Sequence, residues 1–161
     1  MALPVSKLSS GFQAVPHQDG YAEAVVNGMV LHRLFNDTGA ALVSRTPYYE
    51  VESGMSSSDT NGPRAIALVD DAKRHRLVVA LESPADQTWS WFAYKGLVDQ
   101  VIVPSAARTT AHAFKVLDGV VTSTGAVPDY DDEEFAINLE ATETGAACDM
   151  ILLGRDFLAT T

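Results

Sequence analysis

The chain of 161 residues has a single cysteine, Cys148, so no disulfide bond can form within it. Cys148 lies among small and apolar residues in a segment typical of a strand, and no histidine or basic residue stands near it in sequence to activate the thiol. We therefore predict a buried thiol that packs as a small hydrophobe. A chain without disulfides is also expected to assemble in a reducing cytoplasm.

Long hydrophobic runs are missing as well. No stretch approaches the roughly 20 apolar residues that a membrane-spanning helix requires. The segment from Met1 to Lys7 lacks the basic region and apolar run of a secretory signal, so no targeting segment is expected. With 47% hydrophobic and 20% charged residues, the composition is typical of globular proteins. The sequence predicts a soluble, folded protein that has no membrane partner.

Positive charge is scarce. Lys and Arg number 11 against 21 Asp and Glu, which gives a net charge of -10. Such a chain repels phosphate backbones, so we expect no nucleic-acid partner. The basic residues cluster only at Lys73 to Arg76, whereas the run from Asp129 to Glu134 carries five carboxylates. This asymmetry fits either solvated loops of opposite sign or the orientation of the protein on a charged partner.

The signatures of metal and catalytic sites are missing too. The candidate zinc ligands are His17, His32, His75, His112 and Cys148. None of these residues stands at the spacing of roughly two to five positions that is typical of a zinc site. The acidic run lacks the glycine and the spaced glutamate of a calcium loop, which leaves cation binding there as an alternative to a solvated loop. Neither a Gly-x-Ser-x-Gly turn nor a phosphate-binding glycine loop occurs, so we expect no enzyme and no cofactor.

What the chain does have is a series of short β-type runs separated by turn residues. From Tyr21 onward these runs recur at intervals of about 8 to 15 residues, which is typical of a β-sandwich or β-barrel. The dipeptide Asn27-Gly28 between two runs predicts a type I′ hairpin, and Asp118-Gly119 predicts a second. The expected strands are 22–26, 29–35, 40–43, 48–51, 64–69, 77–81, 88–95, 97–103, 112–117, 120–123, 135–140 and 148–153.

These patterns predict a mainly β fold, namely a small antiparallel β-barrel or sandwich formed by a single domain over residues 21–161. Residues 1–20 have no sustained period and are expected to form an irregular N-terminal arm. Only Ser105 to His112 leans toward a helix, of at most one turn. The composition of residues 53–63 predicts an exposed loop.

One expected strand, Thr88 to Lys95, is bulky on both faces. Its alternation sets two groups of side chains on opposite faces, one with Trp89, Trp91 and Ala93 and the other with Ser90, Phe92 and Tyr94. Such a strand either lies in a closed barrel whose exterior is covered or contributes aromatic side chains to a protein interface. Gly96 is expected to end this strand.

Four segments stand in an order that resembles a known family. They are Asn36-Asp37-Thr38-Gly39-Ala40-Ala41-Leu42-Val43, Trp89-Ser90-Trp91-Phe92-Ala93-Tyr94-Lys95-Gly96-Leu97-Val98, Phe135-Ala136-Ile137-Asn138-Leu139-Glu140 and Met150-Ile151-Leu152-Leu153-Gly154. Over residues 33–154 this series resembles the capsid decoration, or head cement, proteins of tailed bacteriophages. In that family an Asn-x-Thr/Ser-Gly-Ala segment opens a small β-barrel, a Trp-rich strand crosses its centre, and two further strands close it. The long arm, the loop at 53–63 and the acidic insert depart from the family pattern.

The resemblance implies a structural virion protein, made in the host cytoplasm, that binds the outer surface of a phage head. It implies that the protein bridges subunits of the major capsid protein and self-associates as a trimer or other small oligomer. We expect the arm, the basic cluster and the aromatic strand to make these contacts. The candidate contact residues are Leu3, Val5, Leu8, Phe12, Lys73, Arg74, Arg76, Phe92 and Tyr94.

Three alternatives stay open at the level of sequence. The first is another virion β-barrel, such as a tail or connector subunit. The second is a small ligand-binding barrel whose cavity would be lined by Trp89, Trp91 and Phe92. The third is a hydrolase, which would require His112 or His75 within hydrogen-bond reach of a serine or carboxylate.

Overall fold

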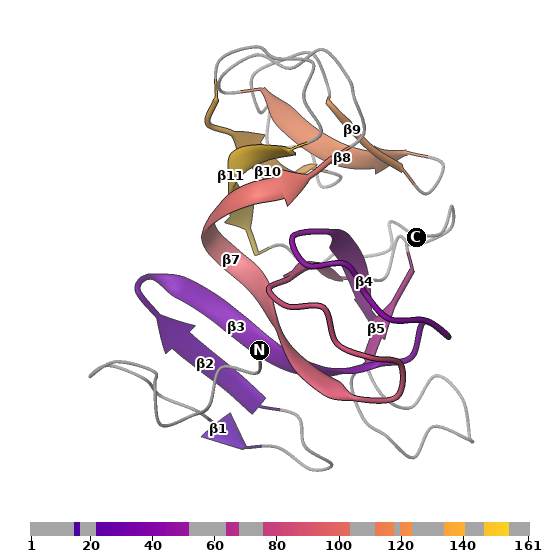
Figure 1. Cartoon of the computed structure of the whole chain (residues 1–161). Helices are drawn as coiled ribbons and strands as arrows, with labels where there is room; N and C mark the ends of the chain where they lie inside the picture. The colour runs from indigo at the N-terminus through magenta and orange to yellow at the C-terminus, as the bar shows by residue number, and fades with distance from the viewer. Residues whose placement is uncertain are drawn as a thin grey trace, which may run out of the picture.

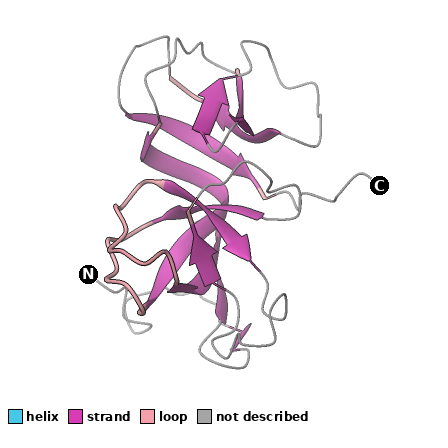
Figure 2. Ribbon diagram, turned by 90° about the vertical axis from the view of Figure 1, so that its right-hand side faces the viewer, coloured by secondary structure: helices cyan, strands magenta, loops and turns pink. Residues whose placement is uncertain are grey.

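The computed structural model describes residues 15–16, 22–51, 64–67, 76–103, 112–117, 120–123, 134–140 and 147–154. All regular structure in these ranges is β-strand (Figure 2). Within the same ranges there is no helix that could cross a membrane. The strands are β1 (Val15–Pro16), β2 (Ala22–Val26), β3 (Met29–Asn36), β4 (Pro47–Val51), β5 (Arg64–Ile66), β6 (Arg76–Ala80), β7 (Trp89–Ile102), β8 (Ala113–Leu117), β9 (Val120–Ser123), β10 (Glu134–Asn138) and β11 (Ala147–Leu153).

All strands belong to one sheet whose order is β1-β2-β3-β5-β4-β6-β7-β11-β10-β8-β9. Because β3 also pairs with β7, the five strands β3, β5, β4, β6 and β7 close into a barrel. The pairing of β3 with β5 is parallel, while the other pairings are antiparallel. The predicted mainly β fold with a barrel is therefore confirmed.

The long strand β7 joins the barrel to the rest of the sheet. Its first half pairs with β3 and β6, and its second half pairs with β11, so it runs from the lower part of the molecule into the upper part (Figure 1). Gly96 lies between the two halves with φ 104°. The expectation that Gly96 ends the strand is wrong, because glycine adopts this φ without the steric cost of a Cβ atom and the 14-residue strand continues through it.

Both predicted hairpins are confirmed. Asn27 and Gly28 have φ values of 50° and 80°, as a type I′ turn requires, and the flanking residues Val26 and Met29 are paired. In the second hairpin Leu117 pairs with Val120, so residues 118–119, which lie outside the described residues, are all that joins β8 to β9.

Two expectations for individual segments are wrong. Ala40 to Val43 form no strand, because their loop folds over the end of the barrel, where the side chain of Leu42 is 4% exposed. The arm is not wholly irregular, since Val15 and Pro16 pair with Glu23 and Ala22 of β2. The expected loop at 53–63 and residues 105–111 of the expected helical turn lie outside the described residues, and His112 is not helical.

The side chains form two hydrophobic cores on opposite faces of the barrel strands. The inner core comprises Leu34, Leu42, Ala65, Val78, Ala80 and Phe92. The outer core lies between the barrel and strands β8 to β11, and its barrel residues include Leu31, Trp91 and Ala93. The predicted separation of Trp91 and Ala93 from Phe92 is thus confirmed, as is the burial of Cys148, which is 1% exposed in the outer core.

Tyr49 of β4 lies in the outer core, and desolvation by burial raises its pKa from the usual tyrosine value of 10.0 to about 12. The pKa of Tyr49 is higher in the folded state than in the unfolded state. The folded protein therefore keeps its full stability below pH 10 and loses stability as the pH rises from about 10 through 12. At roughly 1.4 kcal/mol per pKa unit, the loss should reach about 3 kcal/mol. Urea unfolding of the wild type and of Tyr49→Phe between pH 8 and 12 measures this loss of stability. Parallel losses of stability in both proteins would contradict the prediction.

Candidate functional site

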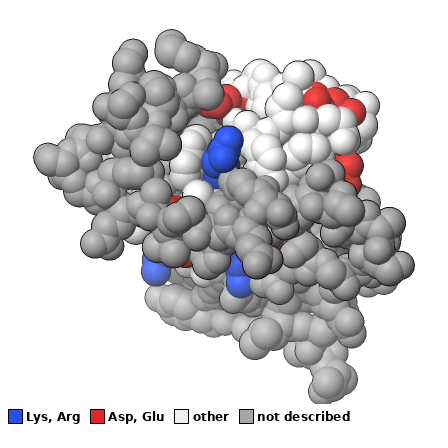
Figure 3. Space-filling view, turned by 90° about the horizontal axis from the view of Figure 1, so that it is seen from below, with Lys and Arg blue, Asp and Glu red and all other residues white. Residues whose placement is uncertain are grey.

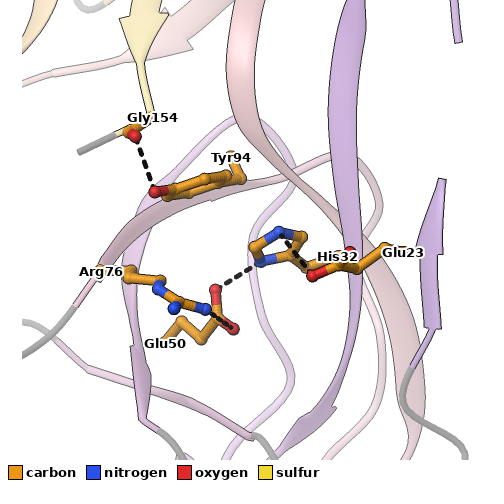
Figure 4. A network of polar contacts seen from close by, with 6 residues as sticks. All are labelled: Glu23, His32, Glu50, Arg76, Tyr94 and Gly154. Carbon is orange, nitrogen blue, oxygen red and sulfur yellow. Dashed lines mark hydrogen bonds and ion pairs between the residues drawn. The ribbon is translucent and has the colours of Figure 1, made fainter. Parts of the chain in front are cut away.

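The inside of the barrel is arranged in layers. The registers place His32 beside Phe92 and Leu34 beside Ser90 across β3 and β7, and Glu50 beside Arg76 across β4 and β6. One end of the interior is therefore polar, the middle is apolar, and the other end is polar again. The polar end formed by Glu23, His32, Glu50, Arg76 and Tyr94 is called the histidine cluster below (Figure 4).

The centre of the histidine cluster is a buried pair of ionisable side chains. Nδ1 of His32 lies 2.6 Å from Oε2 of Glu50, and the two side chains are only 3% and 1% exposed. Nε2 on the other side of the ring lies 3.8 Å from Oε1 of Glu23, whose side chain is 43% exposed at the rim. Both ring nitrogens of His32 thus face carboxylates, which fixes the orientation of the ring.

Arg76 and Tyr94 complete the cluster. The Arg76 guanidinium lies 3.5 Å from Oε1 of Glu50 and 5.8 Å from the centre of the Tyr94 ring. That ring stacks on His32 with 4.5 Å between the ring centres. The Tyr94 hydroxyl donates a 2.6 Å hydrogen bond to the carbonyl oxygen of Gly154, directly after β11. The cluster therefore ties β3, β4, β6 and β7 to the end of the last strand.

The burial of the Glu50 carboxylate indicates the role of the cluster. A carboxylate as enclosed as that of Glu50 is tolerated only when charged or hydrogen-bonding partners surround it, and here His32 and Arg76 do so. The arrangement fixes the orientation of these side chains. We interpret the histidine cluster as a structural cluster whose contacts hold the strands together at one end of the barrel.

The opposite barrel end is held by Asn36, which is 0% exposed. Its amide group donates to the carbonyl oxygens of Ala40 and Ala85 at 2.8 and 3.0 Å. Its Oδ1 accepts hydrogen bonds from the backbone amide and hydroxyl of Thr38 at 3.1 and 2.8 Å. A single side chain thereby fastens the loops at 37–46 and 81–88 over the barrel, and Leu42 fills the space beneath.

Of the predicted contact residues, the structure describes Arg76, Phe92 and Tyr94. Phe92 is 0% exposed inside the barrel, so its prediction as a contact residue is wrong. Arg76 and Tyr94 both belong to the histidine cluster, and the Arg76 side chain is 27% exposed. The remaining predicted residues, Leu3, Val5, Leu8, Phe12, Lys73 and Arg74, lie outside the described residues.

Two further expectations are corrected. Glu134 does not belong to a solvated loop, because it begins β10 and is 3% exposed. The other residues of the acidic run lie outside the described residues. A ligand cavity lined by Trp91 and Phe92 together is excluded, since these side chains belong to cores on opposite faces of β7.

Sequence reasoning considered His32 only as a metal ligand and missed its pairing with Glu50. The available signal was the alternation in β3, which places His32 on the same face as Leu34 and Asn36. The partner was not predictable, because Glu50 lies 18 residues further along the chain and the strand register brings it close. Among the described residues, no group of three or more His, Cys, Asp and Glu side chains is arranged to hold a metal ion.

On the face seen from below, the basic and acidic side chains of the described residues stand separately among uncharged ones rather than in one broad patch of a single sign (Figure 3). Four of the seven exposed large apolar side chains among the described residues lie in one region. Leu97, Ile102, Leu139 and Ile151 are 38% to 57% exposed and stand in β7, in β11 or directly after β10, whereas the other three, Val25, Val43 and Val120, lie elsewhere in the chain.

The chain was also compared with known proteins. A scan against protein-family models, a search of curated proteins and a search of solved structures each found no match.

Proposed function

We propose that the chain is a structural virion protein that binds the outer surface of a phage head and stabilises the shell by bridging subunits of the major capsid protein. The proposal combines the resemblance of residues 33–154 to capsid decoration proteins with the position of the resembling segments in the fold. Binding to the assembled lattice, and not to its separated subunits, stabilises the shell by mass action.

The observation that carries the proposal is the role of Asn36. The resembling segment Asn36 to Val43 coincides with the closure of one barrel end, where Asn36, Thr38 and Ala40 are joined by hydrogen bonds of 2.8 to 3.1 Å. The second resembling segment forms the strand that the barrel shares with the rest of the sheet. The resembling segments therefore form the barrel and close one of its ends.

The filled interior also supports a role for the outer surface. Leu34, Val78 and Phe92 are 0% exposed in the middle of the barrel, and each end is occupied by a bonded polar cluster. Small-molecule sites are concave and enclose most of their ligand. A barrel packed in this way is suited to present its exterior to other proteins.

Cosedimentation tests the proposal. Empty heads assembled from the major capsid protein of the same genome are mixed with the purified chain and pelleted. We expect saturable binding with a fixed ratio of chain to capsid subunits, together with a higher melting temperature of the decorated heads. The chain denatured by heat serves as the control. Absence of the chain from the pellet, or assembly of the chain alone into rings or tubes, would contradict the proposal.

Removal of residues 1–14 tests whether the arm contributes to head binding. The deletion stops before Val15 so that the pairing of β1 with β2 is kept. If the arm lies along a neighbouring subunit, the deletion should lower occupancy on heads at least about tenfold, because each lost contact is repeated on every copy. The melting temperature of the isolated chain should change little. Unchanged occupancy on the heads would refute this role of the arm.

A further inference from the structure

The outer face of the sheet formed by β7, β11 and β10 carries an apolar row that runs across the strands. Leu97 pairs with Ile151, and Ile151 pairs with Ile137, so the three side chains lie side by side on neighbouring strands. Leu97 is 57% exposed and Ile151 is 38% exposed. Their neighbours along the strands, Val98 and Met150, point into the outer core. The row is therefore the solvent-facing side of a sheet whose other side is fully packed.

Charges lie on opposite sides of this row. On one side stands Lys95, which is exposed and forms no ion pair with any residue that the structure describes. On the other side stand Asp99, whose side chain is 65% exposed, and Asp149. Oδ1 of Asp149 accepts hydrogen bonds from the Gln100 backbone and side-chain amides at 2.9 and 3.3 Å, and Asp99 lies 2.9 Å from Arg45. The pattern along β7 is thus positive, apolar, negative.

This pattern is self-complementary under a two-fold rotation about an axis parallel to the row. The rotation places Leu97, Ile151 and Ile137 on the same residues of a second copy and reverses the direction of β7. Lys95 of each copy then faces Asp99 of the other. Two sheets packed face to face lie about 10 Å apart, a separation that a lysine and an aspartate can span.

The charges on this face favour its contact with a second copy. Each copy carries a net charge of -10, so two copies repel each other over most orientations. Asp99 lies 2.9 Å from Arg45, whereas Lys95 forms no ion pair with any described residue. Contact through this face buries apolar area and brings Lys95 of each copy to the exposed Asp99 of the other, which then faces both Arg45 and this lysine, instead of setting like charges against each other.

We propose that the outer face of β7, β11 and β10 is a homodimer interface with two-fold symmetry, in which a second copy of this chain covers the row of Leu97, Ile151 and Ile137. An interface of this kind is isologous, since both copies use the same residues. The inference goes beyond head binding and does not depend on it.

Sedimentation equilibrium of the full chain tests the interface. The wild type should show twice the 17.2 kDa mass of the chain. Leu97→Asp should raise the dissociation constant at least about tenfold, because it sets two carboxylates against each other within the apolar row. Val25→Asp, which alters a side chain that is 46% exposed on β2, is the matched control and should leave the dimer intact. Circular dichroism verifies that both variants are folded.

Charge exchange tests the orientation of the two copies. Lys95→Glu alone and Asp99→Lys alone should each weaken the dimer, because each sets like charges opposite each other twice. The double variant carrying both substitutions restores opposite charges across the two-fold axis and should regain most of the lost affinity.

Three results would overturn the proposed interface. They are a wild type that stays monomeric up to about 1 mM or forms an oligomer other than a dimer, a Leu97→Asp variant that dimerises normally, and a double variant no stronger than the single ones. A monomer that still binds heads would overturn the interface and leave the proposed function standing. A dimer that fails to bind heads would overturn the proposed function and leave the interface standing.

Discussion

Replacement of Gly96 by alanine should lower the free energy of unfolding by about 3 to 5 kcal/mol. A Cβ atom at this position would lie 2.8 Å from the carbonyl oxygen of Gly28 and 2.9 Å from Cα of Met29. Both are backbone atoms of the hairpin between β2 and β3, so they cannot move aside as a flexible side chain would. The φ of 104° adds strain that an L-residue rarely tolerates.

Gly39→Ala is the matched control for this substitution. Gly39 also has a positive φ, of 80°, but a Cβ atom there would have nothing within 4 Å. Its cost should be about 1 to 2 kcal/mol, from backbone conformation alone. Urea unfolding and thermal melting of both variants give the comparison, with a fall in melting temperature of roughly 10 °C for Gly96→Ala. Equal losses of stability would show that the close approach of the hairpin to β7 does not matter.

Replacement of Glu50 by alanine should destabilise the protein by about 3 to 5 kcal/mol. The substitution removes the carboxylate that faces both His32 and Arg76, and it leaves polar groups inside the barrel without their partner. The control is Glu23→Ala. Glu23 also faces His32, but at 3.8 Å and with a side chain 43% exposed, so its removal should cost less than about 1 kcal/mol.

A double variant tests whether His32 and Glu50 are needed chiefly to pair with each other. If His32 and Glu50 serve mainly to satisfy each other, replacing both by leucine should cost much less than the sum of the single replacements. Chemical denaturation of the four proteins of this cycle measures the coupling. Two results would contradict the interpretation of the histidine cluster as a structural cluster. One is a loss of stability in the double variant equal to the sum of the single losses, and the other is a Glu50→Ala variant as stable as Glu23→Ala.

Substitutions in the histidine cluster and in the apolar row should have different effects. Substitution within the cluster should destabilise the fold, and the proposed binding to heads should be lost with it. Substitution at Leu97 alters a side chain that is 57% exposed and should leave folding intact. Comparing melting temperature with head occupancy for these two kinds of variant distinguishes an unfolded barrel from a folded barrel with an altered surface.

Local patterns in the sequence determined much of the fold. Asn27-Gly28 specified its hairpin because both residues tolerate positive φ, and the alternation of Ser90, Trp91 and Phe92 specified which side chains share a face. Both signals depend on neighbours along the chain. The burial of Cys148 followed in the same way, from the apolar residues around it.

Only the tertiary structure decided how distant segments meet. Glu50 of β4 meets His32 of β3 inside the barrel because β3 also pairs with β7 and closes the sheet, a pairing that no local pattern specifies. Gly96 lies within a strand because its φ of 104° and its close contact with the turn at Gly28 both require a residue without a Cβ atom, and that contact is tertiary. The apolar row likewise exists only because β11 pairs with β7 in one register, since a shift of one residue would turn Ile151 into the core.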